Sequence, residues 1–287
     1  MPPIPFATVP PTGYGPGSQP GADEEGLAYL PMPSGMRTYE PHVPEVGDVA
    51  RVGPALATLA AVQEALAAWT PVGGAVLPLD GLDAANRAFL AETLGEGEVS
   101  ILVEADGERI EVQEATFAGV WRVRAAAAKA GPARERIEVA AFPRGVAVRA
   151  FGREPAADPV VAAAPMPGAV NAPAMLTEIL HRARTRRPGE RPHVVNLTLL
   201  PHTPEDLAML EARLGRGGVT ILSRGYGNCR IDATATAGVW RIRYFNSSDT
   251  LILDTIEIVE VPEVACAAPE DIADSAGRLA DVLVALA

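Results

Sequence analysis

The chain has 287 residues, a length that favours two domains, and its 48% hydrophobic and 21% charged residues allow most of it to bury a core. Its formal net charge of −12 argues against a nucleic-acid-binding protein, because phosphate contacts need clustered Lys and Arg. Two cysteines, Cys229 and Cys266, are too few for a disulfide framework or a four-thiolate metal site.

Local patterns exclude further classes of protein. No apolar run approaches the roughly 18 residues that suggest a transmembrane helix. The first residues lack the basic start and the continuous apolar stretch of a secretory signal, so we expect a cytoplasmic protein. Lys129 is the only lysine and is followed by Ala130, which excludes the Lys-Ser/Thr pair of a phosphate-binding loop.

Residues 1–50 are predicted to form an extended or disordered arm, because they contain eleven prolines and no sustained hydrophobic period. The arm carries a net charge of −5, and residues 249–287 carry −8. These acidic ends have two interpretations. They keep the protein soluble, or they attract a basic segment of a partner.

The rest of the chain contains an internal repeat. Ala118-Gly-Val-Trp-Arg-Val-Arg124 recurs as Ala237-Gly-Val-Trp-Arg-Ile-Arg243, and Leu94-Gly-Glu-Gly-Glu-Val-Ser-Ile-Leu102 recurs as Leu214-Gly-Arg-Gly-Gly-Val-Thr-Ile-Leu222. A recurrence in the same order indicates a tandem duplication. The predicted parts are a first repeat at 53–146, a linker at 147–171, a second repeat at 172–265 and a C-terminal helix at 269–287.

Each repeat is predicted to start with a helix, a short strand and a second helix. The first helices are expected at 54–68 and 172–186, and the short strands at 75–79 and 193–199. In the second helix of the second repeat, Thr203 suits the N-cap and Pro204 the first turn, while Gly95 and Gly215 suit the helix ends.

Four strands rich in Val, Ile and Thr are predicted to complete each repeat. Consecutive strands favour mostly antiparallel sheets, so the predicted fold class is α+β. The expected strands are 98–104, 108–114, 117–124 and 134–141, with counterparts at 218–223, 228–234, 237–245 and 251–260.

The C-terminal segment is predicted to be an amphipathic helix. Ile272, Leu279, Val282, Leu283 and Leu286 share one helical face. We expect this face to pack on the second repeat, and docking to a partner protein is the alternative.

No catalytic constellation is present in the sequence. His193 and His202 lie near the ends of one predicted strand without the spacing of a metal site, so we predict surface or loop histidines. Cys229 and Cys266 are predicted to be buried thiols, with iron–sulfur ligation as the alternative. We expect no metal, no cofactor and no enzyme activity.

The repeated Gly-Val-Trp-Arg motif favours a structural role, with partner binding as the alternative. Strand alternation puts Trp121 and Trp240 on the sheet face opposite Val120 and Val239. Only the second repeat continues with polar and aromatic residues, which are either ordinary turn residues or part of a site. The candidate partner-binding residues there are Trp240, Arg241, Arg243, Tyr244, Asn246 and Asp249.

Several segments together resemble the HupH/HyaF/HoxQ family of [NiFe]-hydrogenase maturation proteins. The resemblance is carried by Gly15-Pro-Gly-Ser-Gln-Pro20, Tyr29-Leu-Pro-Met-Pro33, both Gly-Val-Trp-Arg copies, Asn246-Ser-Ser-Asp-Thr-Leu-Ile-Leu-Asp-Thr-Ile-Glu-Ile258, Val261-Pro-Glu-Val264 and Ala268-Pro-Glu-Asp-Ile272. It extends over nearly the whole chain. It adds Gly15, Gly17 and Gln19 to the candidate partner-binding residues.

The resemblance implies a cytoplasmic, non-enzymatic chaperone for the hydrogenase small-subunit precursor, which carries iron–sulfur clusters and a twin-arginine export signal. Such a chaperone prevents premature export or assembly, and other hydrogenase accessory proteins are possible partners. Nucleic acid and membrane insertion are not expected. The alternatives are a factor that handles iron–sulfur clusters through Cys229 and Cys266, and an enzyme whose site lies between the repeats around His193, His202 and Asp249.

Overall fold

The computed structural model describes residues 49–105, 107–126, 134–151, 164, 166–225 and 227–286. These residues fall in one compact unit, Pro41–Ala287. Residues 1–48 of the predicted N-terminal arm, including Gly15, Gly17 and Gln19, lie outside the described residues, and its last two residues begin a short 3-10 helix.

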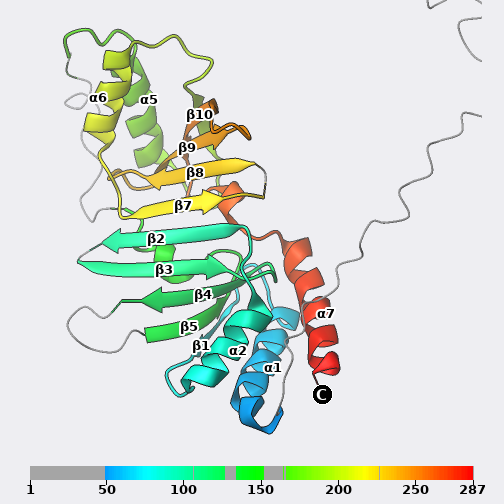
Figure 1. Ribbon diagram of the computed structural model, residues 1–287. Coiled ribbons are helices and arrows are strands. Elements are labelled where there is room, and N and C mark those ends of the chain that lie inside the picture. The colour runs from blue at the N-terminus through cyan, green and yellow to red at the C-terminus, as the bar shows by residue number, and fades with distance from the viewer. Residues whose placement is uncertain are drawn as a thin grey trace, which may run out of the picture. The chain divides into compact units, whose positions relative to one another are not determined.

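The same order of elements occurs twice along the described chain (Figure 1). A short 3-10 helix η1 (Val49–Val52) precedes the first half, and α3 (Arg144–Ala147) and η2 (Glu263–Ala265) close the two halves. The first half comprises α1 (Gly53–Ala67), β1 (Ala75–Pro78), α2 (Ala84–Leu94), β2 (Val99–Ala105), β3 (Glu108–Glu114), β4 (Val120–Ala125) and β5 (Arg134–Val139). The second comprises α5 (Ala172–Thr185), β6 (His193–Asn196), α6 (Pro204–Leu214), β7 (Val219–Ser223), β8 (Asn228–Ala233), β9 (Val239–Phe245) and β10 (Leu251–Ile258).

The helix ends follow the predicted local chemistry. The Thr203 hydroxyl accepts from the Asp206 backbone N–H at 3.0 Å, and the Asp206 carboxylate accepts from the Thr203 N–H at 2.8 Å, so α6 begins with a capping box. Gly95 and Gly215 end α2 and α6 with φ of 59° and 67°, a conformation that favours glycine.

All ten strands form one sheet, in the order β1-β5-β4-β3-β2-β7-β8-β9-β10-β6. Every pair of neighbouring strands is antiparallel. The halves join where β2 pairs with β7, and Ile101 lies opposite Ile221, its own counterpart. The predicted α+β class is therefore correct, and the strands predicted to form mostly antiparallel sheets form one continuous antiparallel sheet.

Both helix pairs lie on the same face of this sheet, at its opposite ends. Val120 of β4 packs in one core with α1 and α2, while Val239 of β9 packs in another with α5 and α6. Trp121 and Trp240 point to the opposite face, where one core spans both halves. The predicted alternation is confirmed, and no described helix covers the central strands between the helix pairs on the helical face.

The chain segments after β5 and β10 each cross to the other half. Phe151, after α3, packs edge-to-face on Trp240 with ring centroids 4.9 Å apart. In return, the N–H of Ala267 donates to the carbonyl of Ala141 at 2.9 Å. The segment after each half packs against the sheet of the other half. The two predicted repeats therefore share one hydrophobic core and are not packed separately.

The position of the C-terminal helix differs from our prediction. Helix α7 (Pro269–Ala285) is amphipathic as expected, but it packs on α1 and buries Ile272, Leu279 and Val282 in the core of the first half. The prediction that it packs on the second repeat is wrong. Hydrophobic periodicity identifies the buried face of a helix, whereas the crossover after β10 decides which half receives it.

Candidate functional site

The uncovered part of the helical face forms a polar trough across the middle of the sheet. Alternate residues of the six central strands point into it. Two cross-strand rows define this central trough: Arg124, Glu111, Leu102, Thr220, Asp232 and Arg241, then Arg122, Gln113, Ser100, Leu222, Arg230 and Arg243.

Two cavities occupy the central trough, one in each half. The larger has a volume of about 600 Å³ and lies beside α6 in the second half. The smaller has a volume of about 420 Å³ and lies over β2, β3 and β4. Leu102 and Thr220 line both cavities, so the two adjoin at the junction of the halves.

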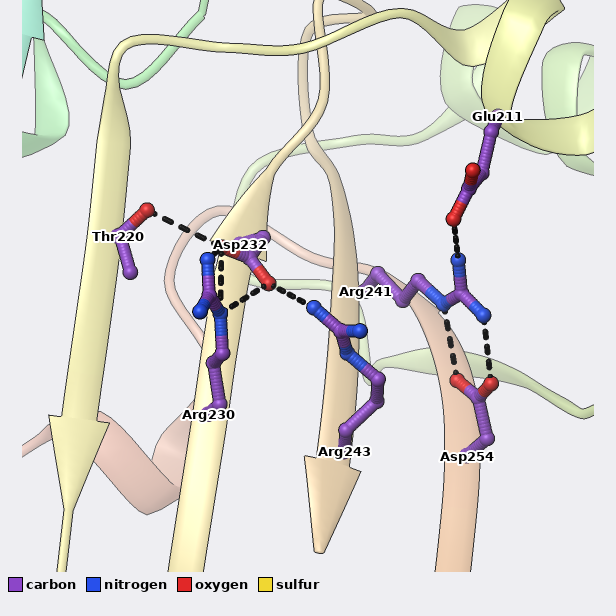
Figure 2. A network of polar contacts seen from close by, with 7 residues as sticks. All are labelled: Glu211, Thr220, Arg230, Asp232, Arg241, Arg243 and Asp254. Atoms are coloured by element: carbon purple, nitrogen blue, oxygen red, sulfur yellow. Dashed lines mark hydrogen bonds and ion pairs between the residues drawn. The ribbon is translucent and has the colours of Figure 1, made fainter. Parts of the chain in front are cut away.

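In the second half, Arg241 is held by two carboxylates (Figure 2). Its Nε and Nη2 donate to the two oxygens of Asp254 at 3.1 and 2.7 Å, and its Nη1 donates to Glu211 of α6 at 2.6 Å. Asp254 is buried and Arg241 is partly buried. This bidentate geometry fixes the guanidinium and ties β9 to β10 and to α6.

A second group of ion pairs centres on Asp232 (Figure 2). Arg230 Nε donates to Asp232 Oδ2 at 3.0 Å, Arg243 donates to the same oxygen at 2.6 Å, and the Thr220 hydroxyl donates to Oδ1 at 3.0 Å. Burial alone would raise the pKa of Asp232, but hydrogen bonds from Arg230 and Arg243 hold it below its usual value. Asp232 therefore stays ionised at neutral pH.

This arrangement is suited to binding rather than to proton transfer. Its carboxylates are engaged by guanidinium groups, and an arginine does not act as a general base at neutral pH. Among the described residues, no group of three or more His, Cys, Asp or Glu side chains is placed to hold a metal ion. A partner can instead exchange ion pairs along the central trough.

The structure divides the predicted partner-binding residues between the two sheet faces. Arg241 and Arg243 lie in the central trough. Trp240 is fully buried on the opposite face, and Tyr244 packs there against the shared core. Trp240 has no exposed surface, so it affects a partner only through the strand that it anchors.

Asn246 and Asp249 lie together in the turn between β9 and β10. The Asn246 side-chain oxygen accepts from the backbone N–H of Ser248 and Thr250 at 2.9 and 3.0 Å. Asp249 has φ of 55°, in the left-handed region. These contacts are those of turn-forming residues.

The structure does not bring His193, His202 and Asp249 together. His193 pairs with Ile258 at one end of β10, while Asp249 precedes the other end of that strand. His193 Nε2 contacts Glu178 at 2.7 Å on the surface. None of the three residues lines either cavity, and the hypothesis of a site built from them gains no support.

Both cysteine thiols are shielded from solvent. Cys229 is buried in the shared core and Cys266 is partly buried beside it. Burial raises the pKa of each thiol to about 12, so both remain protonated at neutral pH. Since thiolates are the metal ligands, the cluster-handling hypothesis gains no support.

On the family resemblance seen in the sequence, we expect the Cys229→Ala, Cys266→Ala double variant to support hydrogenase maturation as well as the wild type does. In the folded wild type, both thiols should react with a thiol reagent far more slowly than in the unfolded chain, because attack requires the thiolate. Hydrogenase activity and thiol labelling measure these outcomes. Loss of maturation by a double variant of unchanged melting temperature would contradict the prediction.

Sequence reasoning missed Glu211, Arg230, Asp232 and Asp254 as members of the site. Arg230 and Asp232 carry a usable signal, because both fall on the polar face of an alternating strand. Glu211 lies on a different element, and only its contact with Arg241 reveals its role.

The described fold and its central trough thus define an α+β protein with an open, charged sheet face. The family model for the C-terminal conserved region of the HupH hydrogenase expression protein matches residues 52–156 and 169–286. The chain belongs to this family, which confirms the resemblance.

Curated relatives agree with this assignment over nearly their full length. The hydrogenase expression/formation protein HupH of Rhodobacter capsulatus is 51% identical over 97% of this chain and 98% of its own. HoxQ of Cupriavidus necator, with the same description, is 46% identical over 96% of both chains. The hydrogenase-1 operon protein HyaF of Escherichia coli is 34% identical over 93% of both chains.

Proposed function

We propose that this chain is a non-enzymatic maturation chaperone for a [NiFe] hydrogenase, acting in the cytoplasm. It binds the small-subunit precursor and prevents its premature export or assembly. The observation that carries the proposal is the match to a hydrogenase expression/formation protein at 51% identity over 97% of this chain. The central trough supports a binding role, because it offers paired charges, and the Asp232 carboxylate beside the Thr220 hydroxyl is already engaged by Arg230 and Arg243.

The acidic C-terminal helix supports the part of the proposal that concerns the export signal. Glu270, Asp271, Asp274 and Asp281 are all exposed on α7, opposite the face that packs on α1. A twin-arginine signal begins with a basic region. Opposite charges accelerate encounter and fix register more than they deepen affinity. Among the described residues, no helix is long and apolar enough to cross a lipid bilayer.

We also propose that the two halves are copies of one ancestral unit. The order of their elements and the pairing of Ile101 with Ile221 support this history. The predicted N-terminal arm at 1–50 remains part of the proposed partner-binding region through Gly15, Gly17 and Gln19.

Native mass spectrometry after co-expression with the small-subunit precursor tests the proposed function. We expect a complex with the precursor, and a weaker one when the signal is deleted. A complex that is indifferent to deletion would place recognition on the precursor body. Absence of any complex, together with normal hydrogenase maturation in a deletion strain, would refute the proposal.

Binding of the signal should weaken with salt. Between about 0.1 M and about 1 M salt the Debye length falls from about 10 to about 3 Å, which screens exposed charges such as those of α7. We therefore expect the dissociation constant of the full precursor to rise over this range, and that of the signal-deleted precursor to rise less. Titration calorimetry measures both. Equal salt dependence would exclude the acidic ends as the signal-binding surface.

A further inference from the structure

The two halves of the central trough differ in how their arginines are paired. In the second half, Arg241 has Asp254 and Glu211, and Arg243 has Asp232. By sheet register, Arg122 and Arg124 of the first half are the counterparts of Arg241 and Arg243. The second half therefore shows which chemical groups an arginine at these positions binds.

The first half lacks two of the three carboxylates. Gln113 lies opposite Arg122, where Asp232 lies opposite Arg241. The helix position equivalent to Glu211 is Ala91. Glu135, equivalent to Asp254, lies opposite Arg124 and pairs with it at 3.6 Å.

Arg122 is consequently left without a carboxylate. Among the described residues, none forms an ion pair or a hydrogen bond with its guanidinium group. The Gln113 Nε2 donates to the carbonyls of Gly97, Val99 and Glu114 at 3.1–3.3 Å, and within the described part of the chain no hydrogen bond joins Arg122 to the Gln113 Oε1. The side chain is partly buried and lines the smaller cavity, of about 420 Å³.

The surroundings of Arg122 favour an acidic ligand. Of the three arginines that line the smaller cavity, Arg109 pairs with Glu104 and Glu111 and Arg124 with Glu135, which leaves Arg122 as the one with no carboxylate among the described residues. A partly desolvated arginine without a counter-ion costs free energy that a carboxylate recovers. Arginine binds carboxylates in a fixed bidentate geometry, so the ligand is selected by shape as well as by charge.

We propose that Arg122 binds an Asp or Glu side chain of the partner protein, supplied by an extended segment that lies in the central trough. The carboxylate of the partner would then pair with Arg122 in the first half, as Asp254 and Glu211 pair with Arg241 in the second half. The inference rests on the proposed function only for the identity of the partner. The acidic occupant follows from the unequal pairing of the two halves.

A labelled octaglutamate peptide tests the acidic occupant without the hydrogenase precursor. We expect the wild-type chain to bind it, and Arg122→Gln to weaken binding about tenfold or more, because a charge-assisted hydrogen bond is lost. Ala91→Glu should weaken it similarly, since this change supplies the missing carboxylate within the chain. Fluorescence anisotropy measures the affinities.

The matched control is Arg213→Gln. It changes the net charge as Arg122→Gln does, but Arg213 is exposed on α6 and lines neither cavity. We expect it to alter affinity less than about twofold, the scale of an exposed charge. Equal weakening by Arg122→Gln and Arg213→Gln, or no binding of octaglutamate by the wild type, would overturn the inference. Unchanged melting temperatures show that all variants fold.

The same variants are then titrated with the small-subunit precursor. A precursor that binds the wild type and Arg122→Gln equally well would overturn the inference and leave the proposed function standing. If the precursor binds neither the wild type nor Arg122→Gln, the proposed function fails. The inference that Arg122 binds an acidic ligand still holds in that case, provided that octaglutamate binding depends on Arg122. If Arg122→Gln abolishes precursor binding, a charge swap identifies the ion pair. Changing Arg122 to Glu and one acid of the precursor to Arg should then restore binding.

Discussion

Replacement of Asp206 with alanine should lower the free energy of unfolding by about 3–5 kcal/mol, because four backbone donors lose their shared acceptor together. Asp206 Oδ1 accepts from the N–H groups of Val170, Asn171 and Ala172 at 2.7–2.8 Å, and Oδ2 accepts from Thr203 at 2.8 Å. The carboxylate is fully buried. One side chain therefore caps both α5 and α6, and chemical denaturation measures the loss.

The contribution of Asp206 should depend on pH. Burial by itself would raise the pKa of Asp206, but the backbone donors outweigh it and hold the pKa well below its usual value. A depressed folded-state pKa contributes stability that is fully present above the unfolded pKa of about 3.9 and is lost as the pH falls further. The difference in unfolding free energy between the wild type and Asp206→Asn should shrink as the pH is lowered from 7 to about 3.

Asn86 provides an internal reference for this experiment. It occupies the equivalent place in the first half, where its Oδ1 accepts from the Ala55 N–H at 2.9 Å. An amide at this position thus serves fewer donors than a carboxylate does. Asp206→Asn should lower the free energy of unfolding less than Asp206→Ala does. A decrease that is equal for both variants and independent of pH would contradict the electrostatic explanation.

Replacement of Leu279 with alanine should lower the free energy of unfolding by about 2–5 kcal/mol, the range for truncating a fully buried leucine. Leu279 lies on α7, is 0% exposed and belongs to the core that includes α1 and α2. Amide hydrogen exchange should therefore accelerate in α1 more than in α5, since local opening follows the weakened contacts.

The matched control for Leu279→Ala is Val284→Ala on the same helix. Val284 is 78% exposed, so its truncation should change stability by less than about 0.5 kcal/mol. Faster exchange in α5 with α1 unaffected would mean that α7 packs on the second half in solution. That outcome would contradict the structure.

Much of the secondary structure could be predicted from the chain because its determinants are local. Thr203 and Asp206 begin α6 through their own hydrogen bonds, and Gly215 ends it with a positive φ. Alternation along β9 correctly placed Trp240 and Arg241 on opposite faces of the sheet. These features need no knowledge of which element lies next to which.

The candidate site was only partly predictable. Arg241 and Arg243 lie in the central trough, but their partners Asp254 and Asp232 come from neighbouring strands. The register in which β9 pairs with β8 and with β10 sets these contacts. Asn246 supports the turn between β9 and β10, which follows from its ability to accept backbone hydrogen bonds locally.

The sequence by itself determined the internal repeat pattern, the α+β class, the amphipathic character of α7 and the alternation of the Trp-Arg strands. The repeat is read from the recurrence of segments along the chain, and the other three depend on hydrophobic period within a few residues. Only the tertiary structure decided that β2 and β7 join the halves in one sheet, that α7 covers α1, and that Arg122 lacks the carboxylates that hold Arg241. The hydrophobic effect is not directional, so an apolar stripe does not specify its partner, and an ion pair depends on which strands the fold makes neighbours.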